Sequence, residues 1–231
     1  MRKAKCTAIV LAAGQGRRMG TTVQKQYLEI QGKPVLYYSL NAFQQSDVID
    51  DIVLVVGEGQ KEYCKTEFVD KFGFTKVSQI VYGGSERYFS VWNGLQAITD
   101  SEYVYIHDGA RPFVTEEIIA RAFESVQVEK ACVVGMPVKD TIKIADDDGY
   151  ADYTPNRNLV WLVQTPQVFD LCLIKEAYAE LMRLEDIPVT DDAMVVEQML
   201  KKKVKLVEGS YENIKITTPE DLFVAESFLK K

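Results

Sequence analysis

The chain has 231 residues, of which 47% are hydrophobic and 26% are charged, a composition typical of a globular protein with a sizeable core. Its net charge of −7 argues against a broad nucleic-acid-binding surface, and no segment offers the roughly 20 consecutive apolar residues of a membrane helix. The four cysteines have no paired spacing, so they indicate neither a disulfide framework nor a zinc site. We expect one domain over residues 1–231 and, without an export signal, a soluble cytoplasmic protein.

Short apolar runs alternate with segments of helical spacing through the first part of the chain. The predicted strands are Thr7–Leu11, Ile52–Val56, Val77–Tyr82, Tyr103–Ile106 and Ala131–Gly135. The predicted helices between them are Pro34–Gln44, Gln60–Phe72, Tyr88–Ile98 and Thr115–Val126. Because strands this apolar are buried on both faces, the alternation predicts an α/β fold with a doubly wound, mostly parallel sheet.

This alternation ends after Pro137. The stretch DTIKIADDDGYADYT is typical of two short strands joined by a turn, and it predicts a β-hairpin arm that projects from the sheet. We interpret residues 138–160 as a dimerisation arm. The remaining elements are predicted at Leu171–Leu184, Asp191–Lys202 and Pro219–Leu229 (helices) and at Val204–Val207 (strand). Thr218 is the expected N-cap of the last helix.

Three polar loops follow predicted strands: GQGRRMG, GGSERY and HDGARP. Ligands bind beyond the carboxyl ends of the strands in sheets of this kind, so these loops are expected to share one site. GQGRRMG fits neither a P-loop nor a dinucleotide fingerprint, since Met19 stands where both require glycine. Its cations Arg17 and Arg18, with Lys25 nearby, favour a nucleoside triphosphate. A plain strand-to-helix turn with solvated arginines is the alternative.

The loop HDGARP places Asp108 at the end of a predicted strand. A single carboxylate there suits Mg²⁺, or another divalent cation, which fills its coordination sphere with water and phosphate oxygens. The alternative is an aspartate that caps the following turn. We interpret His107 as a packed residue rather than a base, because a phosphate nucleophile is already ionised near neutral pH.

Other polar residues are candidates for contacts with the substrates. Ser85, Arg87 and Ser90 could face a nucleobase or a ribose, and Ser90 could equally satisfy the amino terminus of the following helix. Lys215 lies in a strand-like run, where an unpaired cation would be costly, so an anionic substrate could be its partner.

Taken together, the motifs identify a family resemblance. LAAGQGRRMG with KQY, GGSERYFSVWNGL, HDGARP, DTIK, QTPQVF, TDDA and NIKITTPEDL occur in this order, from about Cys6 to Leu229. They resemble the 2-C-methyl-D-erythritol 4-phosphate cytidylyltransferases of the non-mevalonate isoprenoid pathway. The resemblance implies a sheet of nucleotidyltransferase type and homodimers whose arms clasp each other. It also implies transfer of the cytidylyl group of CTP to a polyol phosphate, with release of pyrophosphate.

The resemblance also implies a role for each site residue. The catalytic residues would be Arg18 and Lys25, at the attacked α-phosphate. The nucleotide-binding residues would be Ala12, Ala13, Gly14, Gln15, Gly16, Gly83, Ser85 and Ser90. The substrate-binding residues would be Asp108, Arg111, Thr141, Arg157, Thr190 and Lys215. Thr141 and Arg157 would come from the partner's arm, and Asp108 would also bind the metal.

Three other functions compete with this reading. Ribitol 5-phosphate cytidylyltransferases share the CTP chemistry, but their sequences resemble LAGG and HDSVRP, where this chain has LAAG and HDGARP. A nicotinamide-dependent dehydrogenase is disfavoured by the missing fingerprint. An inactive nucleotide-binding regulator would leave Arg18, Lys25 and Asp108 without a purpose.

Overall fold

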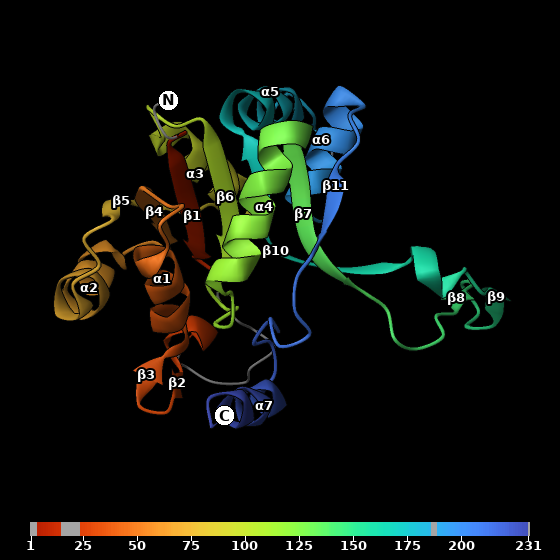
Figure 1. Ribbon diagram of the computed structural model, residues 1–231, viewed down its shortest axis with the longest axis horizontal. Coiled ribbons are helices and arrows are strands. Elements are labelled where there is room, and N and C mark those ends of the chain that lie inside the picture. The colour runs from red at the N-terminus through yellow and green to blue at the C-terminus, as the bar shows by residue number, and fades with distance from the viewer. Residues whose placement is uncertain (1–3, 15–23, 186–188, 231) are drawn as a thin grey trace.

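The centre of the fold is a seven-stranded sheet in the order β11-β7-β10-β6-β1-β4-β5 (Figure 1). The computed structural model describes residues 4–14, 24–185 and 189–230. The strands of this sheet are β1 (Cys6–Ala12), β4 (Asp51–Val56), β5 (Val77–Tyr82), β6 (Tyr103–Asp108), β7 (Ala131–Pro137), β10 (Trp161–Asp170) and β11 (Lys205–Glu208). β10 runs antiparallel to β6 and β7, and the other neighbours are parallel, which confirms the mostly parallel sheet.

Helices cover both faces of this sheet. They are α1 (Val35–Gln45), α2 (Lys61–Cys64), α3 (Arg87–Ala97), α4 (Glu116–Glu129), α5 (Leu171–Leu181) and α6 (Asp192–Leu200), with a π-helical continuation of α2 at Lys65–Asp70. A further helix, α7 (Pro219–Phe228), packs on a separate small core. Neighbouring residues of β1 point into different cores: Val10 packs with Leu40 of α1, and Ile9 packs with Leu95 of α3. This division is the doubly wound arrangement that the apolar pattern predicts.

Two strands of the seven-stranded sheet differ from the sequence-based expectation. β5 is predicted as a buried strand, but it lies at the sheet edge and contains no fully buried residue. β10 is not predicted at all, and it contains Pro166, a residue that is unusual in a central strand. The structure places Pro166 where the register between β10 and β7 shifts, between Val163 and Gln167, so the missing N–H interrupts no regular ladder.

The predicted hairpin arm is present and projects from the body of the protein (Figure 1). Its strands are β8 (Ile144–Ala145) and β9 (Ala151–Tyr153). In the turn between them, the Gly149 N–H donates to the Asp146 carbonyl at 3.1 Å. Gly149 has a φ of 85°, a backbone conformation that glycine adopts without a steric penalty.

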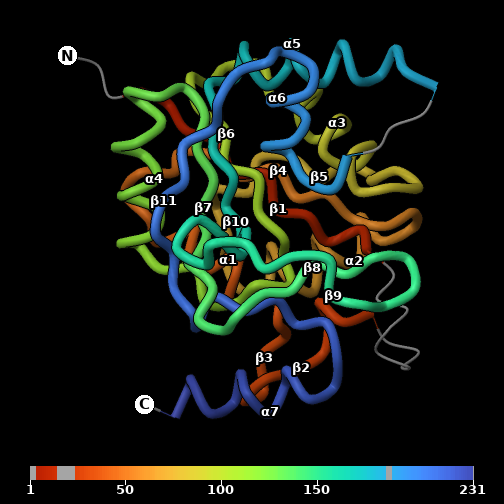
Figure 2. The backbone as a smooth tube through the Cα atoms, turned by 90° about the vertical axis from the view of Figure 1, so that its right-hand side faces the viewer, coloured from red at the N-terminus to blue at the C-terminus, as the bar shows by residue number. Residues whose placement is uncertain are grey.

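The last helix, α7, lies beside a small two-stranded ladder. β2 (Glu29–Ile30) pairs with β3 (Lys33–Pro34), and α7 lies next to them (Figure 2). Thr218 is the N-cap of α7, as predicted, and its N–H donates to the Asp221 carboxylate at 2.8 Å. Just before α7, the Ile216 N–H donates to the Ala110 carbonyl at 2.8 Å, which holds the preceding segment against the HDGARP loop. Among the described residues, no helix is both long and apolar enough to span a bilayer.

Candidate active site

A cavity of about 420 Å³ lies at the carboxyl ends of the parallel strands. The described parts of the loops after β1, β5 and β6 all contribute to it, so GGSERY, HDGARP and Gly14, the first residue of GQGRRMG, meet at one site as expected. Residues 15–20 of GQGRRMG lie outside the described part of the chain. Its lining residues are Leu11, Ala13, Gly14, Lys25, Gln26, Gly84, Ser85, Glu86, Arg87, Ser90, Asp108, Ala110 and Lys215. Carboxylates and cations therefore face the same space.

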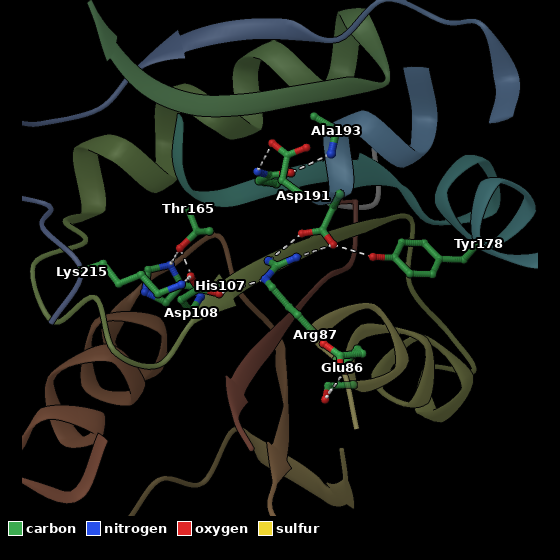
Figure 3. A network of polar contacts seen from close by, with 12 residues as sticks. Glu86, Arg87, His107, Asp108, Thr165, Tyr178, Asp191, Ala193 and Lys215 are labelled. Atoms are coloured by element: carbon green, nitrogen blue, oxygen red, sulfur yellow. Dashed lines mark hydrogen bonds and ion pairs between the residues drawn. The ribbon is translucent and has the colours of Figure 1, made fainter. Parts of the chain in front are cut away.

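Asp108, the last residue of β6, forms ion pairs with two cations of the cavity. Its Oδ2 lies 2.7 Å from Nζ of Lys215, and its Oδ1 lies 3.3 Å from Nε of Arg87 (Figure 3). Burial alone would raise the pKa of Asp108, but the charges of Arg87 and Lys215 outweigh it and hold this pKa well below its usual range. The carboxylate is therefore ionised at neutral pH.

Arg87, at the start of α3, contacts a second carboxylate. Its Nη1 and Nη2 donate to the two oxygens of Asp192 on α6, each at 2.8 Å. Asp192 is fully buried and also accepts the hydroxyl of Tyr178 at 2.6 Å. The arginine thus joins two acidic residues that are far apart in the sequence.

His107 is buried beneath the site and is tied to it by both ring nitrogens. Nε2 faces the Arg111 carbonyl at 3.1 Å, so it must carry the proton, and Nδ1 then accepts the Thr165 hydroxyl at 3.0 Å. The same hydroxyl accepts the Asp108 N–H at 3.1 Å. Because both nitrogens are engaged, the histidine is a structural link between Asp108 and Arg111, as expected from the sequence, and not a base.

This burial predicts a pH dependence of stability. Burial lowers the pKa of His107 to about 4, whereas a histidine in an unfolded chain titrates near 6.5. The unfolded chain therefore binds this proton first as the pH falls. The free energy of unfolding is expected to decrease by about 2 kcal/mol between pH 7 and pH 5.

Denaturant unfolding in divalent-free buffer measures this effect. His107 is the single histidine of the chain, so His107→Gln removes the titrating group and provides the control. The variant is expected to be less stable at pH 7 but to lose little further stability by pH 5. An equal loss in both proteins would contradict the assignment.

Gln26, of the KQY motif, brings Lys25 to the cavity. Its Nε2 donates to the carbonyl oxygens of Ala12 at 2.6 Å and Gly14 at 3.2 Å. These bonds attach the short 3₁₀-helix Lys25–Tyr27 to the end of β1. No role was predicted for Gln26, although it lies in the KQY motif that contributes to the family resemblance.

The loop after β5 is closely packed. A Cβ on Gly83 would lie 2.5 Å from Cβ of Ala13 and 2.6 Å from Oγ of Ser90, so only glycine fits there. Ser90 accepts the Gly84 N–H at 3.1 Å and donates to the Glu86 carbonyl at 3.2 Å. Its hydroxyl therefore orders this loop and the start of α3, while Ser90 also lines the cavity.

Known proteins with similar sequences identify the family of this chain. A family model described as 2-C-methyl-D-erythritol 4-phosphate cytidylyltransferase matches residues 6–231. The chain belongs to this family. A 2-C-methyl-D-erythritol 4-phosphate cytidylyltransferase from Lachnoclostridium phytofermentans is 51% identical over 227 residues, which are 98% of this chain and 97% of the relative. A relative of the same name from Lachnospira eligens is 52% identical over 225 residues, or 97% and 99% of the two chains.

Solved structures of the family have the same fold. The crystal structure of 4-diphosphocytidyl-2C-methyl-D-erythritol synthase from Anaerococcus prevotii matches with a TM-score of 0.88 and 37% identity, covering 99% of this chain and 97% of that chain. The 2-C-methyl-D-erythritol 4-phosphate cytidylyltransferase from Thermus thermophilus matches with a TM-score of 0.76 and 32% identity, covering 96% and 98%. The ribitol 5-phosphate alternative is not favoured by these matches.

Several residues that the family resemblance assigned to the site meet in the cavity. Those that line it are Ala13, Gly14, Lys25, Ser85, Ser90, Asp108 and Lys215. Ala12 and Gly83 lie directly beside lining residues. Gln15, Gly16 and Arg18 lie outside the residues that the structure describes. The roles expected for them, triphosphate binding for Gln15 and Gly16 and catalysis for Arg18, therefore stay predictions.

The other predicted substrate residues are not in the cavity lining. Arg111 is held by the segment before α7, since its Nη1 donates to the Asn213 carbonyl at 2.8 Å. Thr190 is exposed and borders a separate hollow of about 20 Å³ beside Tyr178. Thr141 and Arg157 belong to the arm, where Nη1 of Arg157 donates to the Lys139 carbonyl at 3.3 Å. None of these side chains lines the cavity of its own chain.

The structure corrects the strand-like interpretation of Lys215, since residues 213–217 are irregular. It also adds partners that the sequence did not reveal: Lys215 pairs with Asp108, and Arg87 pairs with Asp108 and Asp192. Both cations line the cavity, so their suggested contacts with substrates stay predictions. These ion pairs join distant segments, which local sequence patterns do not reveal.

Proposed function

We propose that this chain transfers the cytidylyl group of CTP to 2-C-methyl-D-erythritol 4-phosphate. The products are 4-diphosphocytidyl-2-C-methyl-D-erythritol and pyrophosphate. Membership of the family over residues 6–231 supports the reaction. The observation that carries it is the cavity that brings Lys25, Asp108 and Lys215 together beside Gly14, in the loop after β1.

The reaction needs positioning and charge compensation. A phosphate oxygen of the acceptor attacks the α-phosphorus of CTP in line, a new P–O bond forms, and the bond to the pyrophosphate oxygen breaks with its electron pair. The acceptor phosphate is ionised near neutral pH, so the step needs no general base. Lys25, together with Arg18, offsets the charge that builds up on the α-phosphate oxygens, and Lys215 attracts the acceptor phosphate.

Asp108 suits a divalent cation that travels with the nucleotide. No group of three acidic, histidine or cysteine side chains that could form a complete metal site occurs in the described part of the chain. Mg²⁺ commonly uses one or two carboxylates and takes its other ligands from phosphates and water, so a single ionised carboxylate in the cavity fits it. Bound there, Mg²⁺ would neutralise charge on the triphosphate. Asp108 is the residue that would hold it.

The arm is proposed to complete the site of a second copy in a homodimer. Large apolar side chains are exposed on the arm and at its base: Ile144, Tyr150, Tyr153, Leu159, Leu162 and Val163. Exposed apolar groups that cluster on one projection are typical of a protein interface. The arm projects from the body of the protein (Figure 1), and Thr141 and Arg157, which belong to it, do not line the cavity. A two-fold dimer would let each arm deliver them to its partner.

Mixing two inactive variants tests the shared site. Lys25→Ala removes a residue of the cavity, and Arg157→Ala removes a residue of the arm. If the arms cross, a mixed dimer has one site with both defects and one intact site. Subunit exchange between the variants is then expected to restore about a quarter of wild-type turnover.

Pyrophosphate release from CTP and the methylerythritol phosphate measures the recovery. The control is Lys25→Ala mixed with the double variant Lys25→Ala/Arg157→Ala, which cannot form an intact site. If the first mixture is no more active than this control while mixed dimers are detected by mass, each arm does not serve the partner's site.

A further inference from the structure

The two cations on Asp108 are anchored very differently. Both terminal nitrogens of Arg87 are bound by Asp192, which leaves only Nε for Asp108 (Figure 3). Asp192 is fully buried and is itself held by the Tyr178 hydroxyl. The Arg87 and Lys215 side chains are similarly exposed, at 30% and 35%, so the difference lies in their bonds: Lys215 reaches Asp108 with a single ammonium on a flexible stem.

This difference decides which cation can leave. To turn away from Asp108, Arg87 would have to break its bidentate pair with Asp192, and that fully buried carboxylate would lose its charge partner, which is strongly unfavourable. Lys215 needs only rotations about its side-chain bonds. When phosphates and a divalent cation enter, the Oδ2 side of Asp108 can therefore change partners while the Oδ1 side stays fixed.

The Arg87–Asp192 pair is not required merely to dock α6. Gln167 of β10 fixes the start of that helix independently. Its Nε2 donates to Asp191 Oδ2 at 3.0 Å, and its Oε1 accepts the Ala193 N–H at 2.8 Å (Figure 3). Besides docking α6, Arg87 links Asp192 of that helix to Asp108.

We propose that Arg87, locked by Asp192, is a positioning residue that keeps Asp108 aimed into the cavity, and that Lys215 is the partner that Asp108 releases when substrates bind. The inference rests on the proposed role of Asp108 in cytidylyl transfer. It extends the site to Asp192 on α6, a residue that lies behind the cavity lining.

Arg87→Lys and Asp192→Asn test the positioning role. Each is expected to lower kcat about 10- to 100-fold, the usual effect of removing a partner that orients a ligand. Each is also expected to reduce the factor by which Mg²⁺ strengthens CTP binding, measured by calorimetry in EDTA and in MgCl₂. The double variant should be no worse than the poorer single variant, because both changes break one unit.

Gln167→Met is the matched control, since it loosens the other anchor of α6 without touching Asp108. It is expected to lower Tm, while kcat and the factor by which Mg²⁺ strengthens CTP binding stay near their wild-type values. If Arg87→Lys and Asp192→Asn behave like this control, the pair is only structural and the inference is wrong. Should either variant fail to fold, Tyr178→Phe removes just one bond to Asp192. It is expected to lower kcat several-fold, and an unchanged kcat and magnesium factor would overturn the inference.

Asp108→Asn separates this inference from the proposed function. If Asp108→Asn retains wild-type kcat, the proposed role of Asp108 fails, and the positioning role fails with it. If Asp108→Asn is inactive but Arg87→Lys and Asp192→Asn are fully active, only the positioning role fails.

Discussion

Lys25→Ala is expected to lower kcat about 100- to 1000-fold, which is the usual cost of losing a preorganised charge at the reacting group. Lys25 lines the cavity at the end of β1, where Gln26 holds it through Ala12 and Gly14. Its charge is needed most when the α-phosphate gains negative charge in the transition state. The dissociation constant of CTP should therefore rise by less than about tenfold.

Single-turnover kinetics and calorimetry measure the two effects separately. Lys65→Ala is a suitable control, because Lys65 is exposed on the π-helical segment and its loss changes the net charge equally. Arg18→Ala is expected to behave as Lys25→Ala does. A variant that binds CTP much more weakly but keeps its kcat would show that the cation serves binding and not catalysis.

Asp108→Asn is expected to lower kcat/KM at least about 100-fold, since it removes the only charge by which this residue could hold a divalent cation. The amide keeps the shape of the side chain but no longer neutralises Lys215, which lies 2.7 Å away. Mg²⁺ should then strengthen CTP binding much less than it does in the wild type. Calorimetric titration of CTP, with and without Mg²⁺, measures this difference.

Glu58→Gln is the control for Asp108→Asn. Glu58 is exposed in the turn after β4, at the same edge of the sheet, and it does not line the cavity. Its replacement removes one negative charge near the site and is expected to leave kcat/KM unchanged. If both variants lose activity equally, a general change of potential is responsible and Asp108 has no specific role.

The regular elements were largely predictable because their signals are local. Val10 and Ile9 in β1 face opposite cores, and an apolar run of this kind is visible in the sequence. The polar loops were equally visible, and the rule that ligands bind at the carboxyl ends of strands brought them to one site. Thr218 and the hairpin turn at Gly149 follow from simple residue preferences.

The missed features depend on packing between distant segments. β10 contains Pro166, which is unusual in a central strand. The register shift against β7 shows how the strand accommodates this residue. The Arg87–Asp192 pair joins α3 to α6 across 105 residues of sequence. The segment that carries Lys215 is held beside Ala110 by the backbone bond from Ile216. Sequence spacing carries no information on such contacts, so these charged side chains were identified without their partners.

Pyrophosphate release from CTP, with 2-C-methyl-D-erythritol 4-phosphate and ribitol 5-phosphate as parallel acceptors, is the most direct test of the central claim. The reaction is run with wild-type protein in MgCl₂ and in EDTA. We expect rapid release with the methylerythritol phosphate in MgCl₂, very little with ribitol 5-phosphate, and almost none in EDTA. Preference for ribitol 5-phosphate, or no release with either acceptor, would contradict the proposed function.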